Sequence, residues 1–280
     1  MSPLVDIGCG DGSLLAGIRD ALSSETRRQF RFFGVDRSLG RLRPELASDP
    51  DLHFVRDVAD VPNAPALVIS NELFDAFPFA RLVQREEALR ELWVVERDGA
   101  LDWEERDPPA EYVAYFADRG VRLEAGQFAD ISLEWERAYG AIARHFGRGL
   151  LVTVDYGFPE EKLFDARVRR YGTAAAFRRH EVTRDLLAEP GEQDLTAHVN
   201  FTDLIRAGER AGWRTVAFER QARFLLGLGV TDHPLLAPLG TVEPADADAA
   251  IALAMRRDAA RRLVLPDGIG DEMRVLVQER

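Results

Sequence analysis

Glycines at alternate positions follow a short apolar segment at the start of the chain. Leu4–Ile7 lead into Gly8, Gly10 and Gly12, and an apolar helical run from Leu14 to Leu22 follows. A strand that ends in a glycine loop before a helix builds a cradle for an anion or a nucleotide, because backbone N–H groups point at the ligand and no side chain blocks it. The third glycine of a dinucleotide fingerprint would stand one residue later, at Ser13, so the spacing speaks against a dinucleotide.

Two aspartates end the next two predicted strands. Asp36 follows Phe30–Val35, and Asp57 comes just after His53–Val55. A carboxylate at the end of the second strand can accept hydrogen bonds from both ribose hydroxyls of an adenosine. Each aspartate can equally be a solvated turn residue.

The first glycine loop, read from Asp6, has the pattern D-I-G-C-G-D-G-S. This pattern resembles the first motif of class I methyltransferases that use S-adenosyl-L-methionine (SAM). The resemblance implies SAM as the cofactor and Asp57 as the residue that binds the adenine amino group. The cofactor-binding residues that it implies are Asp6, Gly8, Gly10, Gly12, Asp36, Asp57 and Asn71.

A further polar group follows the fourth predicted strand, Ala66–Ser70. Asn71, Glu72 and Asp75 come directly after it, and Asp155 stands in the fifth predicted strand. Open α/β sheets bind ligands at the carboxyl ends of their strands, so we expect these side chains to lie at the reactive edge. Asn71 is also a candidate N-cap of a helix.

The residues around Asn71 carry a more specific resemblance. Ser70–Phe79 reads S-N-E-L-F-D-A-F-P-F, which resembles the S-N-E-x-x-D-x-x-P signature of the methyltransferase family that contains the mitochondrial complex I assembly-factor arginine methyltransferase and its bacterial relatives. Further blocks resemble this family across nearly the whole chain: Asp155-Tyr156-Gly157, Gly172-Thr173, Arg178-Arg179-His180 and Gly191–Phe201. Asn200 departs from the usual aspartate, and the segment that precedes the first strand in relatives is missing here.

The family resemblance implies a SAM-dependent methyltransferase that modifies a protein side chain, arginine in particular. A guanidinium stays protonated near neutral pH and pairs well with carboxylates, so we expect Glu72 and Asp155 to hold it, with Asn71 directed toward the methyl-bearing end. His180 and His198 are candidate proton acceptors or structural histidines. The candidate catalytic residues are Asn71, Glu72, Asp155 and His180, and no metal is expected. Two alternatives stay open: a SAM-binding assembly or scaffold protein with weak or no catalysis, and a dinucleotide oxidoreductase.

The alternation of strands and helices predicts an α/β fold with a doubly wound, mostly parallel, seven-stranded Rossmann-like sheet. The last two strands are Thr215–Glu219 and Met273–Gln278. We expect a single methyltransferase domain over residues 1–280. It has a helical and hairpin insertion at about 80–148, with the hairpin turn at Asp98-Gly99, and a second helical insertion at about 221–270.

Composition limits the partners. The chain of 280 residues has a net charge of −12, which argues against a surface that binds nucleic acid. One cysteine and no signal peptide predict a cytoplasmic location, and no apolar stretch is long enough to insert into a membrane. We therefore expect a protein substrate. A homodimer is one alternative for the oligomeric state.

Overall fold

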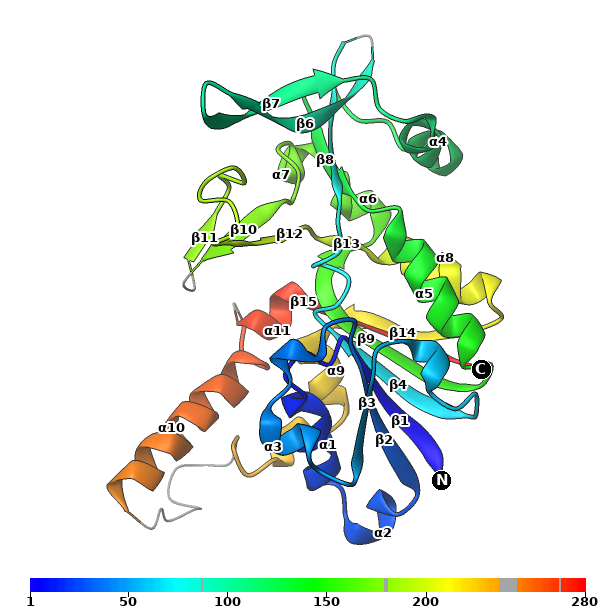
Figure 1. Cartoon of the computed structure of the whole chain (residues 1–280), viewed down its shortest axis with the longest axis vertical. Coiled ribbons are helices and arrows are strands. Elements are labelled where there is room, and N and C mark those ends of the chain that lie inside the picture. The colour runs from blue at the N-terminus through cyan, green and yellow to red at the C-terminus, as the bar shows by residue number, and fades with distance from the viewer. Residues whose placement is uncertain (87, 179–180, 237–245, 267) are drawn as a thin grey trace. The chain divides into compact units, whose positions relative to one another are not determined.

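The computed structural model of the chain describes residues 1–86, 88–178, 181–236, 246–266 and 268–280 (Figure 1). Its largest sheet has the strand order β14-β15-β9-β4-β1-β2-β3, and β13 pairs with the end of β9. The strands are β1 (Ser2–Ile7), β2 (Phe30–Val35), β3 (Leu52–Val55), β4 (Ala66–Asn71), β9 (Gly149–Phe158), β13 (Val199–Asn200), β14 (Arg214–Arg220) and β15 (Met273–Glu279).

The pairing of the central strands is parallel. In the register, Ile7 of β1 lies beside Val35 of β2 and Ser70 of β4, so the residues that follow these strands emerge at one edge of the sheet. Strands β14 and β15 are antiparallel. All seven predicted strands are present, and β13 makes the sheet eight-stranded where the sequence predicts seven.

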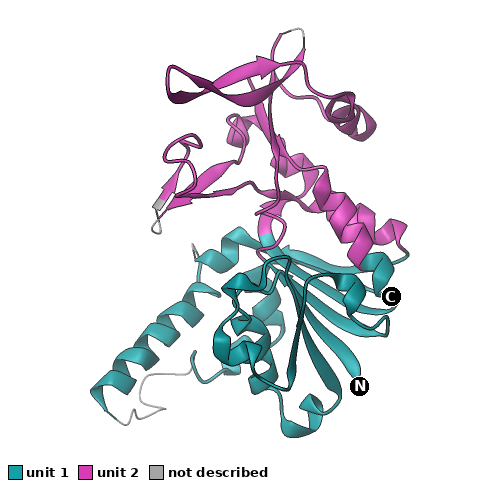
Figure 2. Cartoon of the chain, in the orientation of Figure 1, with its two compact units in different colours: residues 1–71, 143–155, 212–280 teal, residues 72–142, 156–211 magenta. Residues whose placement is uncertain are grey.

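Apolar side chains explain how the first helix packs on this sheet. Leu4, Phe32 and Leu52 from three strands form a buried cluster with Leu15 and Ala16 of α1 (Ser13–Ala21). The chain divides into two compact units, and unit 1 comprises residues 1–71, 143–155 and 212–280 (Figure 2). The helices of unit 1 are α1, α2 (Ser24–Arg27), α3 (Pro44–Ala47), α9 (Gln221–Gly227), α10 (Ala247–Arg262) and α11 (Ile269–Glu272). Short 3₁₀ turns lie at Leu39–Arg41, Val58–Asp60 and Val230–Asp232.

Unit 2 comprises residues 72–142 and 156–211 and contains two antiparallel sheets. The four-stranded sheet has the order β7-β6-β5-β8, and the three-stranded sheet has the order β11-β10-β12. Their bounds are β5 (Ala80–Gln84), β6 (Leu89–Arg97), β7 (Ala100–Arg106), β8 (Phe128–Ile131), β10 (Ala175–Arg178), β11 (Glu181–Thr183) and β12 (Asp194–Thr196). The helices that begin in this unit are α4 (Ala110–Arg119), α5 (Glu134–His145), α6 (Glu160–Leu163), α7 (Ala166–Arg169) and α8 (Phe201–Arg210).

The hairpin is formed where the sequence predicts it. Asp98 and Gly99 join β6 to β7 with φ angles of 53° and 80°, a left-handed pair that suits a tight hairpin turn. The hairpin belongs to a sheet with β5 and β8, which the expected insertion of a hairpin and helices did not include. One face of this sheet is buried by Tyr115 and Phe116 of α4, which pack on Leu82 and Ile131.

The division into two units does not follow the predicted insertions. Unit 2 begins at Glu72 and also takes in residues 156–211, which the sequence assigned to the main domain, whereas residues 221–270 belong to unit 1. The description as a single domain stays a prediction. Among the described residues, no helix combines the length and apolar character that a membrane crossing requires.

Candidate functional site

The glycine loop after β1 depends on left-handed backbone conformations. Gly8, Gly10 and Gly12 have φ angles of 77°, 55° and 83°, a region that side-chain-bearing residues rarely adopt. The N–H groups of Gly8 and Cys9 donate to the Val35 carbonyl at 2.7 and 3.2 Å, which fixes the loop on the end of β2. A Cβ at Gly12 would lie 2.8 Å from Leu42, whereas a Cβ at Gly10 would have no atom within 4 Å. Gly10 therefore faces open space, as a ligand cradle requires.

Asp36 holds this loop. One oxygen of its carboxylate accepts a hydrogen bond from the Gly10 N–H at 3.0 Å, and the other accepts from the Ser38 N–H at 2.9 Å. The residue stands directly after β2, where the sequence places the ribose-binding carboxylate. Each carboxylate oxygen can accept a further hydrogen bond, so the observed contacts leave capacity for ribose hydroxyls.

Asp6 is the unusual group of this region. It is 1% exposed, and its Oδ2 atom has no hydrogen-bond partner in the part of the chain that the structure describes. Burial, with a smaller contribution from the negative charge of Asp36, raises the pKa of Asp6 to about 7. A buried carboxyl oxygen without a partner beside an open glycine loop fits a site that receives a polar or cationic ligand.

Asp57 has a clear local role. Its Oδ1 atom accepts a hydrogen bond from the Ala59 N–H at 2.9 Å and so caps the turn Val58–Asp60. This is the turn role that the sequence left open for it. An exposed carboxylate that caps a turn with one oxygen keeps its second oxygen for a ligand group, so the two roles are compatible.

The end of β4 differs from one expectation. No helix begins after Asn71, because residues 72–79 form bends and a turn before β5, so the interpretation of Asn71 as an N-cap is wrong. Glu72 has a φ angle of 49°, which is uncommon for a residue other than glycine. Such left-handed residues cluster at functional sites, where the surrounding structure holds them.

Asp155 lies in β9 and is 0% exposed. In the register between the two parallel strands, Asn71 is the partner of Val154. Because successive side chains of a strand point to opposite faces, Asn71 and Asp155 leave the sheet on opposite faces. The structure therefore places both residues at the carboxyl ends of adjacent strands without bringing their side chains onto one face.

Several of the recognised sequence blocks meet within unit 2. Thr196 donates its hydroxyl to Asp75 Oδ2 at 2.9 Å, and the Ala197 N–H donates to the Asp75 carbonyl at 3.2 Å. The His198 N–H donates to Thr173 Oγ1 at 3.2 Å, and the His198 ring lies 5.4 Å from the Phe158 ring. Asp75 thus braces the loop that carries His198. His180, the other histidine of the prediction, lies outside the described residues.

The Gly172-Thr173 block has a physical reason that the sequence did not reveal. Asp130, fully buried in β8, accepts hydrogen bonds from the N–H groups of Thr173 and Ala174 at 2.7 and 2.8 Å and pairs with Arg81. A Cβ at position 172 would lie 2.2 Å from Asp130 Oδ2. Only glycine therefore fits there. An aspartate inside the apolar run Phe128–Ile131 was the one available signal.

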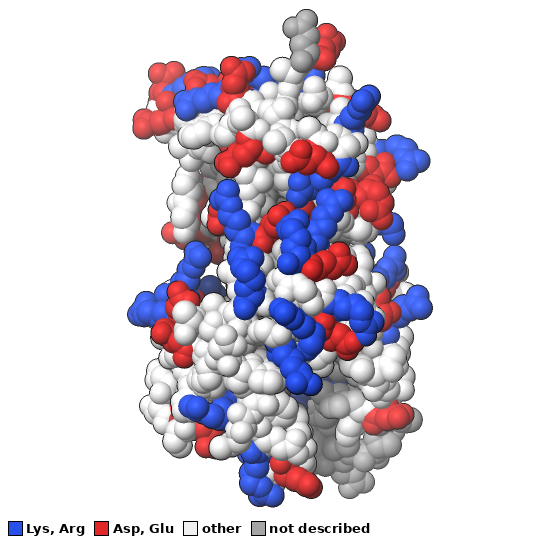
Figure 3. Space-filling model, turned by 90° about the vertical axis from the view of Figure 1, so that its right-hand side faces the viewer, with Lys and Arg blue, Asp and Glu red and all other residues white. Residues whose placement is uncertain are grey.

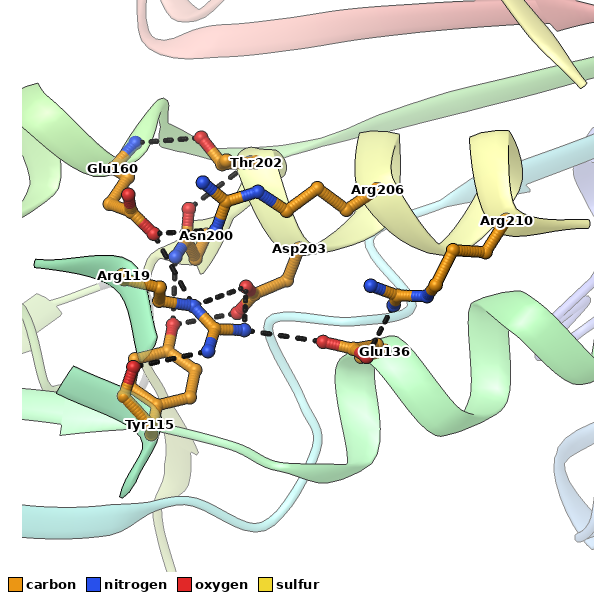
Figure 4. A network of polar contacts seen from close by, with 9 residues as sticks. All are labelled: Tyr115, Arg119, Glu136, Glu160, Asn200, Thr202, Asp203, Arg206 and Arg210. Carbon is orange, nitrogen blue, oxygen red and sulfur yellow. Dashed lines mark hydrogen bonds and ion pairs between the residues drawn. The ribbon is translucent and has the colours of Figure 1, made fainter. Parts of the chain in front are cut away.

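A second buried network in unit 2 was not predicted (Figure 4). The Tyr115 hydroxyl donates to Asp203 Oδ2 at 2.6 Å and accepts from Asn200 Nδ2 at 2.7 Å. Arg119 donates to Asp203 at 2.7 Å and stacks 3.7 Å from the centre of the Tyr115 ring. Burial raises the pKa of Asp203 although Tyr115 and Arg119 stabilise its charge.

Further charges surround this network. Arg119 also lies 3.3 Å from Glu160 and 3.2 Å from Glu136, and Arg206 pairs with Glu160 at 3.2 Å. Asn200 caps α8 by accepting from the Thr202 N–H at 3.1 Å. Figure 3 shows one face of the molecule, on which basic and acidic side chains lie next to one another.

Comparison with known proteins gives consistent findings. Residues 2–219 match the family model described as "Putative S-adenosyl-L-methionine-dependent methyltransferase". The chain is 31% identical over 177 residues to the mitochondrial protein arginine methyltransferase NDUFAF7 homolog of Drosophila melanogaster, and 28% identical over 181 residues to the NDUFAF7 protein of Xenopus tropicalis. These matches cover 59% and 62% of this chain but only 37% and 39% of the two relatives.

Two solved structures from Burkholderia thailandensis are similar over the whole chain. The first has a TM-score of 0.83 at 26% identity and is covered to 74% of its length. The second has a TM-score of 0.81 at 27% identity, is covered to 72% and contains bound S-adenosyl-homocysteine.

Proposed function

From the premise that this chain belongs to the family of S-adenosyl-L-methionine-dependent methyltransferases, we propose that it methylates an arginine side chain of a protein. The family match over residues 2–219 carries the proposal, and the open glycine loop beside the buried Asp6 supports it. The relatives named as arginine methyltransferases support the choice of arginine as the acceptor. The match decides against a dinucleotide oxidoreductase.

The residues of unit 1 fit the cofactor. The space beside Gly10 can receive the amino acid end of SAM, and Asp6 offers a buried oxygen to its positive charge. Asp36 and Asp57 come after β2 and β3, and each keeps capacity for a ribose or adenine hydrogen bond. Bound SAM supplies an electrophilic methyl group on a sulfonium. The residues that would hold it are Asp6, Gly8, Gly10, Gly12, Asp36, Asp57 and Asn71.

The acceptor needs positioning more than acid or base chemistry. An arginine guanidinium is held well by carboxylates, which can form two parallel hydrogen bonds with it. Glu72 and Asp155 are the carboxylates that we assign to this task. The left-handed backbone of Glu72 supports a functional role for it, whereas Asp155 lies on the face of the sheet opposite Asn71 and is the weaker of the two assignments. Orientation of the guanidinium toward the methyl group would then supply most of the rate acceleration. Asn71 is assigned to the methyl-bearing end and His180 to a proton-accepting role.

Glu72→Gln tests the assignment. The change keeps the shape of the side chain and removes the charge that holds the guanidinium, so SAM affinity stays within about twofold while methyl transfer falls by at least about 100-fold. Isothermal titration measures the first quantity, and transfer of a radioactive methyl group into lysate proteins measures the second. Glu111→Gln, at an exposed position of α4, is the matched control and keeps full activity. Unchanged transfer by the Glu72 variant would refute the role of this residue.

The same labelling decides between the enzyme and the alternative of a SAM-binding assembly protein. A protein that binds SAM by titration and labels no polypeptide in any relevant lysate would be the assembly protein. Our remaining predictions are a protein substrate, no nucleic acid partner, no membrane insertion and a cytoplasmic location, whereas the curated relatives are mitochondrial. A homodimer stays the alternative to a monomer.

A further inference from the structure

The hairpin of β6 and β7 has two faces of different character. The strands pair in continuous antiparallel register from Glu91 opposite Arg106 to Arg97 opposite Ala100, so side chains alternate between the faces. The Trp93 face carries Glu91, Trp93, Val95, Asp102, Glu104 and Arg106. The Trp103 face carries Leu92, Val94, Glu96, Leu101, Trp103 and Glu105.

The arginines on the Trp93 face pair with carboxylates of the same face. The guanidinium of Arg106 lies 4.9 Å from the centre of the Trp93 ring and donates to Glu104 at 2.8 Å. Arg97 pairs with Asp102 at 3.1 Å and with Glu104 at 3.0 Å. An arginine stacked on a tryptophan beside a carboxylate is therefore already built into this face.

Among the described residues, the Trp103 face carries a cation only beside Glu105, which pairs with Arg85. In the described part of the chain, no guanidinium lies over the Trp103 ring and Glu96 has no ion pair. Val94 lies opposite Trp103 and is 48% exposed, and Leu101 lies opposite Glu96 and is 39% exposed. The face thus presents an exposed apolar stripe that ends at an unpaired carboxylate.

Charge identifies the kind of partner. Residues 89–107 hold seven acidic and three basic residues, a net charge of −4 in 19 residues, against −12 for the 280 residues of the chain. A third of the net negative charge therefore lies on this short segment. A complementary partner must be basic and must bring apolar side chains for the stripe.

We propose that the Trp103 face of the hairpin docks a basic segment of the protein substrate, in which arginine or lysine alternates with apolar residues. The apolar side chains cover Val94 and Leu101. A guanidinium stacks on Trp103 beside Glu96, as Arg106 stacks on Trp93 beside Glu104. The proposal rests on the proposed function, because it names the surface that recognises the polypeptide to be methylated.

The probe is a fluorescent 12-residue peptide of alternating arginine and valine, and the readout is its anisotropy with the full chain. Glu96→Lys is expected to weaken binding about tenfold at low ionic strength, and Glu45→Lys, the same charge reversal on α3, less than twofold. Raising the salt concentration should remove most of the difference. The double variant Val94→Ser with Leu101→Ser is expected to weaken binding about tenfold at any salt concentration, and Ile251→Ser on α10 to leave it unchanged. Equal binding by all variants would overturn the proposal.

Two further readouts separate the outcomes. Sedimentation of the Val94 and Leu101 variant tests whether a second copy of the chain occupies the face, and a loss of dimers without a loss of peptide binding would overturn the proposal. Methyl transfer tests the proposed function independently. Labelling of substrates with an unchanged KM in the Glu96 variant would refute the docking proposal and support the proposed methyltransferase function. Binding of the peptide through the hairpin without any labelling would support the docking proposal and refute the proposed function.

Discussion

Polar groups serve different purposes in the two units. In unit 1, the carboxylates of Asp36 and Asp57 accept hydrogen bonds from backbone N–H groups. One buried oxygen of Asp6 has no hydrogen-bond partner among the described residues. In unit 2, Asp130 and Asp203 are held by arginines and by N–H or hydroxyl donors. Unit 1 thus retains hydrogen-bonding capacity for a ligand, whereas the buried polar groups of unit 2 stabilise the unit itself.

The largest expected effect tests the structural half of this contrast. Arg119→Met removes the cation beside Asp203, which is 1% exposed, and leaves that carboxylate buried without an ion pair. The free energy of unfolding should fall by about 3–5 kcal/mol, measured by urea denaturation. Arg137→Met is the control, since Arg137 pairs with Glu134 at the surface, and it should cost less than about 1 kcal/mol. Equal losses in the two variants would show that the buried network stabilises unit 2 no more than a surface ion pair does.

Gly10→Val tests the ligand-binding half. The side chain would fill the open space beside the loop, and SAM affinity should fall by at least about 100-fold, or about 2.7 kcal/mol, by isothermal titration. Gly120→Val is a matched control, because Gly120 has a φ angle of 65° and also no atom within 4 Å of a built Cβ. Both variants carry the strain of a left-handed valine, about 1–2 kcal/mol, so only the loss of SAM affinity distinguishes them. Similar SAM affinity in the two variants would contradict the cradle.

The same contrast separates what the sequence could predict from what it could not. Unit 1 follows from local patterns: apolar strands, a glycine loop and aspartates just after strands. Each of these patterns is contained within a few consecutive residues. The parallel register then brings Gly8, Asp36 and Asn71 to one edge. Even there, alternation along β9 placed Asp155 on the face opposite Asn71, because one residue of register decides the face.

Unit 2 depends on partners that are distant in the sequence. Tyr115 and Asp203 are 88 residues apart, and Asp130 and Ala174 are 44 residues apart. No local spacing encodes such pairs, so the sequence shows the family motifs without showing which contacts require them. Gly172 is an example: it belongs to one of these motifs, but the Asp130 oxygen that excludes a side chain there belongs to a distant strand.

A smaller effect tests why asparagine stands at position 200. Asn200 both caps α8 and donates to the Tyr115 hydroxyl, which in turn donates to Asp203. Asn200→Asp keeps the cap but loses that donor and adds a negative charge near Asp203, so the free energy of unfolding at pH 7 should fall by about 1–3 kcal/mol. Asn63→Asp, at an exposed position, should have no measurable effect. An unchanged free energy of unfolding at pH 7 would contradict this prediction. It would show that the Tyr115 hydroxyl tolerates a hydrogen-bond acceptor at position 200 in place of the donor.

The smallest effect concerns the pH dependence of unit 1. Because the pKa of Asp6 is raised to about 7, its carboxyl is protonated below that pH and cannot stabilise a cationic ligand. SAM affinity should rise by up to about tenfold per pH unit between pH 5.5 and 7 and then level off, and Asp6→Asn should flatten this profile. Titrations should stay below about pH 7.5, where the amino group of the ligand is still protonated.

The stability of the ligand-free protein should change with pH in the direction opposite to SAM affinity. The pKa of Asp6 in the folded protein lies above its value of 3.8 in the unfolded chain, so the folded state binds the extra proton between about pH 4 and pH 7. The contribution of Asp6 to the free energy of unfolding therefore decreases as pH rises through this window, while SAM affinity increases. One carboxyl that lowers stability and strengthens ligand binding on ionisation is what a site shaped for a cation requires; parallel slopes in the two measurements would show that Asp6 serves the fold alone, as the carboxylates of unit 2 do.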